Sequence, residues 1–191
     1  ITFLGTGGGR HTSMYQSRCT GGMLIRHDGG TIHMDPGPGA AAQMHRIRYD
    51  PENTTAVIVS HAHPDHYSDA EVVIEGMTHG GWTKRGRIYG SVSVIEGADG
   101  LGPCFSQYHL SRAEGYSSFK AGDVLDVDGM TVEVMKAVHN DPNNVGFIMH
   151  TPYGKVAYVS DTEYTPDIAR QYIGTRVLML PVTTPFHDRI K

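Results

Sequence analysis

The sequence predicts a domain of the α/β class, in which strands and helices follow one another along the chain. Residues 56–59, AVIV, form a short apolar run of the kind that makes a buried strand. Residues 68–71, SDAE, have the form of a capping box and predict a helix over residues 70–77. The histidine-rich stretch of residues 60–66 lies between them, at the strand end, where α/β proteins place their binding sites.

Length and composition narrow the class of protein. The 191 residues fit a single domain, expected to span residues 1–191, with enough chain to bury a core. The net charge of −4, without a basic block, gives no case for binding to nucleic acid or to anionic membranes. This composition does not exclude a nucleotide-sized substrate. Two cysteines, no apolar run of membrane length and no signal peptide predict a cytoplasmic protein without a disulfide framework.

The segments before the histidine-rich stretch predict a strand, a hairpin and a helix. Residues 1–4 read as a strand, and the glycine-rich GTGGGR follows. Its N–H groups could cradle a phosphate, but a tight turn is favoured because neither a helix-forming segment nor GK[ST] follows. Residues 22–26 and 31–34 flank a turn and predict a β-hairpin. Residues 40–48 predict a helix after the turn DPGPG.

The second half of the chain predicts mainly strands. Residues 97–115 have no clear period, and residues 122–129 alternate apolar and acidic positions, which is typical of a strand with one wet face. The other predicted elements are strands over residues 84–89, 130–138, 145–150 and 155–159, a short helix or strand over 92–95, a helix over 166–173 and a last buried strand over 177–182.

The stretch HAHPDH has the composition of a metal site. His61 and His63 stand two apart in extended backbone, so that both imidazoles point the same way and can reach one metal ion. Pro64 then turns the chain and brings in Asp65 and His66 as a second pair. Three imidazoles and one carboxylate suit zinc, with iron or manganese as alternatives. His45, His79 and His109 are read as non-ligands, His109 being a weak candidate for the pocket rim.

HAHPDH also resembles the H-x-H-x-D-H signature of the metallo-β-lactamase-fold hydrolases. The opening FLGTGGG and the later SDT resemble the tRNase Z and cyclic phosphodiesterase branches of that superfamily more than its β-lactamases. The resemblance implies a four-layer αββα sandwich.

The resemblance also implies further site residues. His139, at the end of a predicted strand, matches the third ligand of the first metal, and Asp161 of SDT matches a carboxylate that bridges two metals. The alternative role for Asp161 is to cap the helix over residues 166–173. The bridging role is favoured because Thr162 or Thr165 is available as the cap. Asp35 matches an acidic residue that orients a ligand histidine, with a turn-forming role as the alternative. The implied ligands are His61, His63 and His139 for the first metal, Asp65 and His66 for the second, and Asp161 for both.

The end of the sequence departs from the family pattern. The family supplies one more histidine to the second metal from beyond the last strand, and His187 has neighbours unlike those expected around that ligand. We expect this ligand, and the last covering segment of the fold, to lie beyond Lys191.

The implied chemistry is hydrolysis. Two divalent metals that share a hydroxide supply a nucleophile at neutral pH, and Asp65 is the catalytic candidate that orients it or shuttles a proton. The predicted function is phosphodiesterase-type hydrolysis of a small or nucleotide-like substrate. The alternatives are a lactone or thioester hydrolase of the glyoxalase II type and a metal-binding module without turnover.

Overall fold

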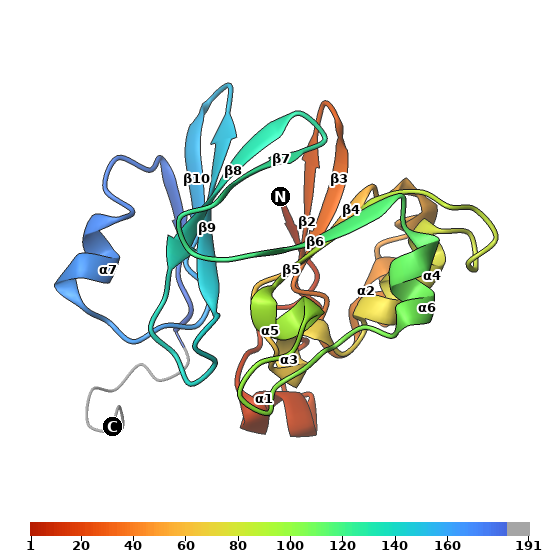
Figure 1. The fold of residues 1–191 in the computed structure, drawn as a ribbon, viewed down its shortest axis with the longest axis horizontal. Helices are drawn as coiled ribbons and strands as arrows, with labels where there is room; N and C mark the ends of the chain where they lie inside the picture. The colour runs from red at the N-terminus through yellow and green to blue at the C-terminus, as the bar shows by residue number, and fades with distance from the viewer. Residues whose placement is uncertain (183–191) are drawn as a thin grey trace.

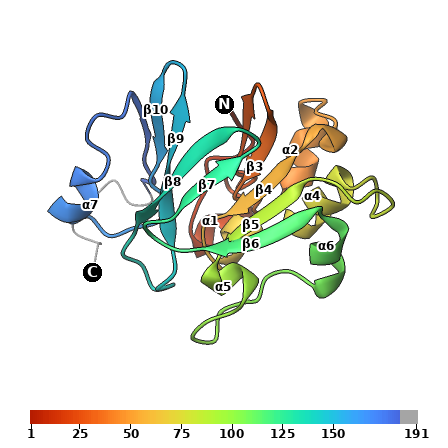
Figure 2. The ribbon, with the colours of Figure 1, turned by 45° about the horizontal axis from the view of Figure 1, so that its top comes forward.

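The computed structural model describes residues 1–182 and contains two β-sheets that face each other, with helices on both outer sides (Figure 1). The predicted α/β class and four-layer arrangement are therefore confirmed. Helices α2, α4 and α6 cover the outer side of the first sheet, and α7 covers the outer side of the second (Figure 2). No helix among the described residues is both long enough and apolar enough to span a bilayer.

The first sheet has the strand order β1-β2-β3-β4-β5-β6. Its first three strands pair antiparallel, and the strands from β3 to β6 pair parallel. Helices separate the parallel strands in sequence, as crossover connections require. The strands are β1 (Thr2–Phe3), β2 (Met23–His27), β3 (Gly30–Met34), β4 (Ala56–Val59), β5 (Arg87–Ser91) and β6 (Gly115–Phe119).

The second sheet has the order β11-β10-β9-β8-β7, and its strands pair antiparallel except for β10 and β11. Two-residue turns join β7 to β8 and β9 to β10, whereas a loop over residues 137–144 joins β8 to β9. The strands are β7 (Val124–Val127), β8 (Met130–Lys136), β9 (Val145–Thr151), β10 (Gly154–Tyr158) and β11 (Val177–Met179).

The helices are short and lie mostly between the strands of the first sheet. They are α1 (Arg10–Tyr15), α2 (Ala40–Arg46), α3 (Pro64–Tyr67), α4 (Ala70–Met77), α5 (Val92–Ile95), α6 (Gln107–Arg112) and α7 (Pro166–Arg170), with a 3₁₀ turn at Pro51–Asn53. Thr165 caps α7 by accepting a hydrogen bond from the N–H of Ile168, which leaves Asp161 free of that role.

Three buried apolar layers hold the four structural layers together. Between the sheets, Ile32 and Ile58 of the first belong to one cluster with Phe147 of the second. Outside the first sheet, α4 packs its apolar face on β4 and β5, and outside the second, Ile168 of α7 packs near Ala157. Burial of apolar surface contributes roughly 25 cal/mol per Å², so these layers determine how the sheets face each other.

Several local predictions are wrong. The N-cap residue of α4, Asp69, makes no capping hydrogen bond, so SDAE is not a capping box although the helix spans residues 70–77 as predicted. A helix, α1, does follow the glycine-rich loop. Strand β11 is an edge strand rather than a buried one, with Val177 and Leu178 44% and 45% exposed. Helix α6 lies in a stretch without a clear period.

Candidate metal centre

The histidine-rich stretch leaves the end of β4 and turns at once into α3. His61 is fully buried, and His63 has extended backbone and stands immediately before the helix. Pro64 begins the helix, where its fixed φ and missing N–H are compatible with the first turn. Asp65 and His66 therefore lie in one helical turn directly beside the two extended histidines.

Three imidazole rings meet in a first group formed by His61, His63 and His139. Nδ1 of His63 lies 2.9 Å from Nε2 of His61 and 3.1 Å from Nε2 of His139. The candidate ligand nitrogens of the three rings all lie within 4.8 Å of one another, so one ion could contact all three. His139 comes from the loop after β8, so the second sheet contributes to this group.

A second group contains His61, His66 and Asp161. Oδ2 of Asp161 lies 3.6 Å from Nε2 of His66 and 3.8 Å from Nε2 of His139, so this carboxylate faces both groups. Oδ2 of Asp65 lies 3.6 Å from the same nitrogen of His66. The residues that the sequence singled out thus come together, Asp65 at the margin of the second group.

Asp35 lies behind His66 and accepts four hydrogen bonds. Nδ1 of His66 lies 2.9 Å from its Oδ2, and the hydroxyl of Tyr158 donates to the same oxygen over 2.8 Å. Ser60 donates its N–H to Oδ1 and its hydroxyl to Oδ2. These contacts hold the ring of His66 with Nε2 directed at Asp161.

Burial favours the neutral imidazole at His61 and His63. Burial, together with repulsion from the neighbouring histidines, lowers the pKa of His61 well below 6.5, and burial also lowers the pKa of His63. Burial alone would lower the pKa of His66 too, but the charges of Asp35 and Asp161 outweigh it and raise that pKa to about 10. Burial opposes ionisation of Asp161, yet the proximity of His66 and His139 lowers its pKa.

These donors fit a divalent cation. Nε2 of His66 is buried and has no hydrogen-bond partner among the described residues, which is costly unless the site holds a further group. Imidazole nitrogens and carboxylate oxygens in two adjoining groups are the donors that zinc and iron take. We conclude that the residues present are suited to hold metal.

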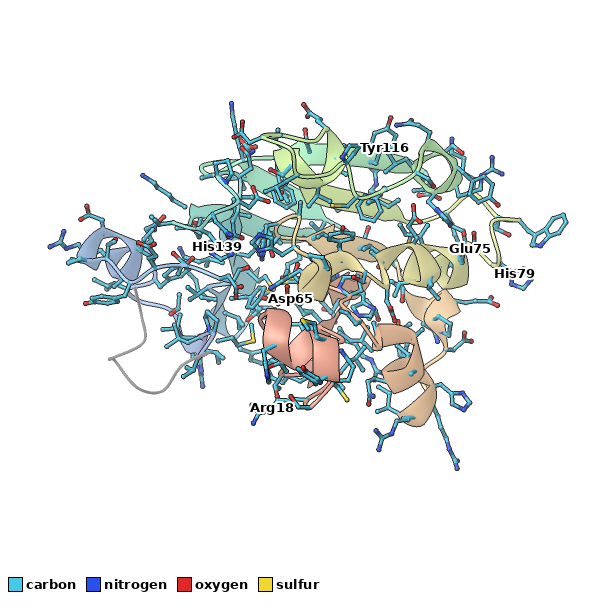
Figure 3. All side chains as sticks on the ribbon, turned by 90° about the horizontal axis from the view of Figure 1, so that it is seen from below. Arg18, Asp65, Glu75, His79, Tyr116 and His139 are labelled. Atoms are coloured by element: carbon cyan, nitrogen blue, oxygen red, sulfur yellow. The ribbon has the colours of Figure 1, made fainter. Side chains whose placement is uncertain are left out.

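A pocket of about 830 Å³ opens beside the second group. Asp65, His66 and Asp161 line it together with the glycine-rich loop, residues 5–8, and with Arg18. The loop contacts the site directly, because the N–H of Gly9 donates to Oδ2 of Asp65 over 2.6 Å. Figure 3 shows His139 and Asp65 in the middle of the molecule and Arg18 beside α1.

The other histidines that the structure describes do not join the centre. His109 lies on α6 with its two ring nitrogens 3.0 and 2.9 Å from Glu71 and Glu75, so it is not at the pocket rim. His79 pairs with Glu52, at the end of the molecule away from His139 (Figure 3). His187 lies outside the described residues. Sequence reasoning missed Ser60, Tyr158 and Asp141, because only their distant partners reveal them.

Comparisons with known proteins agree with this geometry. The family model described as "Beta-lactamase superfamily domain" matches residues 31–189. The uncharacterized protein MJ1374 of Methanocaldococcus jannaschii is 38% identical over 191 residues, which are 100% of this chain and 72% of that relative. Ribonuclease Z of Methanosarcina acetivorans is 29% identical over 143 residues, which are 75% of this chain and 46% of that relative.

Solved structures share the fold. The metallo-β-lactamase fold protein YhfI from Bacillus subtilis has a TM-score of 0.73 at 20% identity, over 93% of this chain and 68% of that chain. Human tRNase Z, short form, has a TM-score of 0.66 at 17% identity, over 93% of this chain and 75% of that chain. At such identities the likeness is one of fold alone.

Proposed function

Because the chain belongs to the β-lactamase superfamily, we propose that it is a hydrolase that depends on two divalent metal ions and cleaves phosphodiester bonds in a small or nucleotide-like substrate. The observation that carries the proposal is the position of Asp161, whose Oδ2 faces His66 and His139 at 3.6 and 3.8 Å. One carboxylate that faces two groups of donors is suited to join two cations.

The proposed ligands divide between the two groups. His61, His63 and His139 would hold one ion, Asp65 and His66 would hold the other, and Asp161 would contact both. When bound, such ions lower the pKa of water towards about 7 and stabilise negative charge that develops on the attacked group. Zinc is our first choice, with iron or manganese as alternatives.

Residues of the chain supply orientation and recognition. Asp65 lines the pocket, and the hydrogen bond from Gly9 fixes its carboxylate, so it is the candidate to orient a water molecule or to accept a proton. Arg18 also lines the pocket and makes no ion pair among the described residues, so its guanidinium is free to contact an anionic substrate. A pocket of about 830 Å³ matches a nucleotide-sized ligand.

The relatives favour a phosphodiester over a lactone or thioester. Two Methanosarcina proteins named Ribonuclease Z are 29% and 27% identical to parts of this chain. A ribonuclease cleaves RNA, whose backbone is a phosphodiester. RNA is for that reason a second candidate substrate. The chain spans 46% of each of these relatives, so their activity as whole proteins is a proposal for this one.

A substrate panel tests the proposed function. The protein is loaded with Zn²⁺, Mn²⁺ or Fe²⁺ and given a chromogenic aryl phosphodiester, a short oligoribonucleotide, a lactone and a thioester. We expect turnover on a phosphodiester that falls at least about 100-fold in Asp65→Asn, as for loss of a general base. Turnover on the lactone or thioester alone would favour the glyoxalase II type. Bound metal without turnover on any substrate would identify a binding module.

A further inference from the structure

A buried carboxylate outside the proposed ligand set joins the loops that carry the metal-binding residues. Asp141 lies just after His139 and is 1% exposed. Its Oδ2 accepts the N–H of Ala62 over 2.9 Å. Its Oδ1 accepts the hydroxyl of Ser93 over 2.7 Å and the N–H of Asn143 over 2.9 Å.

The bond to Ala62 is the informative one. Ala62 separates His61 from His63, so the acceptor of its N–H fixes the backbone that carries two imidazoles. Asp141 itself belongs to the loop that carries the third imidazole, His139. The bond therefore ties the two halves of the first group directly together, across the boundary between the two sheets.

Asn144, in the same loop, makes the matching contact to the second group. It is 3% exposed, and its side-chain amide donates to the backbone oxygen of Asp161. The hydroxyl of Ser160 lies 3.5 Å from the side-chain oxygen of Asn144 and donates to Ser60 over 3.0 Å. Residues 141–144 thus contact both other loops that supply ligands.

We propose that Asp141 and Asn144 are positioning residues, Asp141 for the first group and Asn144 for Asp161. This rests on the proposed metal centre. Burying a carboxylate costs free energy, which the hydrogen bonds from Ala62, Ser93 and Asn143 offset. The placement of Asp141 is explained if its task is to hold the spacing of three imidazoles.

The test is the zinc affinity of each group on its own. In a His66→Ala background only the first group remains intact, and in a His139→Ala background only the second. We expect Asp141→Asn to weaken zinc binding about tenfold or more in the first background and clearly less in the second, whose group depends on the Ala62 segment only through His61. Both oxygens of Asp141 accept hydrogen bonds, so the amide nitrogen of asparagine faces an N–H or O–H donor in either orientation and at least one hydrogen bond is lost. Asn144→Ala should weaken zinc binding more in the His139→Ala background than in the His66→Ala background.

A matched control separates positioning from ordinary stability. Asp69 also accepts a backbone N–H, that of Ala41 over 3.1 Å, but this bond joins α4 to α2. Asp69→Asn should leave the zinc dissociation constants within about twofold of the parent protein. Thermal unfolding with a chelator present reports the stability of every variant without metal.

The outcomes are distinct. A parent protein that binds no zinc would overturn the metal centre and this inference with it. The parent protein could instead bind zinc while Asp141→Asn and Asp69→Asn have equal zinc dissociation constants in both backgrounds. That result would overturn the positioning role and leave the proposed function standing. If Asp141→Asn does not fold, Asn144→Ala carries the test, and unchanged zinc affinity of the second group in that variant would overturn the positioning role of this loop.

Discussion

Oδ2 of Asp161 lies 3.6 Å from Nε2 of His66, a buried nitrogen without a hydrogen-bond partner among the described residues. Asp161 follows β10 of the second sheet, whereas His66 lies in α3, directly after β4 of the first. The contact therefore exists only because the two sheets face each other. The packing between the sheets is therefore a condition for the proposed metal centre.

Replacing Asp161 by alanine should cost at least one metal equivalent. Among the described residues, Asp161 is the carboxylate that faces both His66 and His139, so the variant deprives the second group of a donor and removes the proposed link to the first. Metal content per chain after dialysis, measured by plasma emission, checks this. Asp167→Ala, which removes an exposed carboxylate of α7, serves as the control and should retain all metal. Unchanged metal content in Asp161→Ala would contradict the bridging role.

Asp35→Asn should weaken zinc binding about 10- to 100-fold. Both oxygens of Asp35 accept hydrogen bonds, so the amide nitrogen of asparagine faces a donor in either orientation. In place of Oδ1 it faces the N–H of Ser60. In place of Oδ2 it faces the Ser60 hydroxyl, the His66 ring and the Tyr158 hydroxyl. Its φ of 51° suits asparagine as well as aspartate, so the backbone is not strained. Zinc titration measures the loss.

The control for Asp35→Asn is Asp50→Asn, which changes a carboxylate that accepts only the N–H of Glu52 in an exposed turn. Equal zinc affinity of the two variants would mean that Asp35 does not orient His66.

Gly37→Ala should damage both stability and metal binding. A Cβ at Gly37 would lie 1.9 Å from the carbonyl oxygen of Asp65 and 2.3 Å from that of Thr20, so backbone must move. We expect a loss of about 1–3 kcal/mol in the free energy of unfolding and weaker zinc binding, because Asp65 belongs to the site. Urea denaturation and zinc titration measure the two effects.

Gly115→Ala is the matched control, since its Cβ would meet only a side-chain nitrogen of Arg87, at 3.6 Å. If Gly37→Ala resembled this control in both measurements, the close approach of residue 37 to the site would be unimportant.

His33 should make the protein sensitive to acid. It is fully buried, its Nε2–H donates to the carbonyl oxygen of Gly21 over 2.9 Å, and burial lowers its pKa to about 4. The unfolded chain takes up this proton near the ordinary pKa of 6.5 and the folded chain only near 4. The free energy of unfolding should therefore fall by about 3 kcal/mol as the pH drops from about 6.5 to about 4.

The measurement is urea denaturation at stepped pH with a chelator present, for the parent protein and for His33→Gln, which does not titrate. The variant should lose the contribution of His33, about 3 kcal/mol, to the fall in stability between about pH 6.5 and 4, and keep that of the other buried histidines. An identical slope in both proteins would refute the assignment to His33.

Local sequence patterns predicted much of the fold. The hairpin of β2 and β3 follows from two β-rich runs around a glycine turn, and α4 lies where SDAE predicts a helix, although Asp69 makes no capping hydrogen bond. Helix α6 and strand β6 were missed because residues 97–115 mix polar and apolar positions without a local period. The exposure of β11 was also unpredicted, because an apolar run does not reveal whether its strand lies at a sheet edge.

The sequence by itself determined that His61, His63, Asp65 and His66 lie together, because extended backbone and one helical turn place neighbouring side chains within a few ångströms. Only the tertiary structure decided that Asp141 holds Ala62, 79 residues away, and that Tyr158 holds Asp35, 123 residues away. Such contacts depend on how two sheets pack, and packing is decided by the apolar burial of many residues at once.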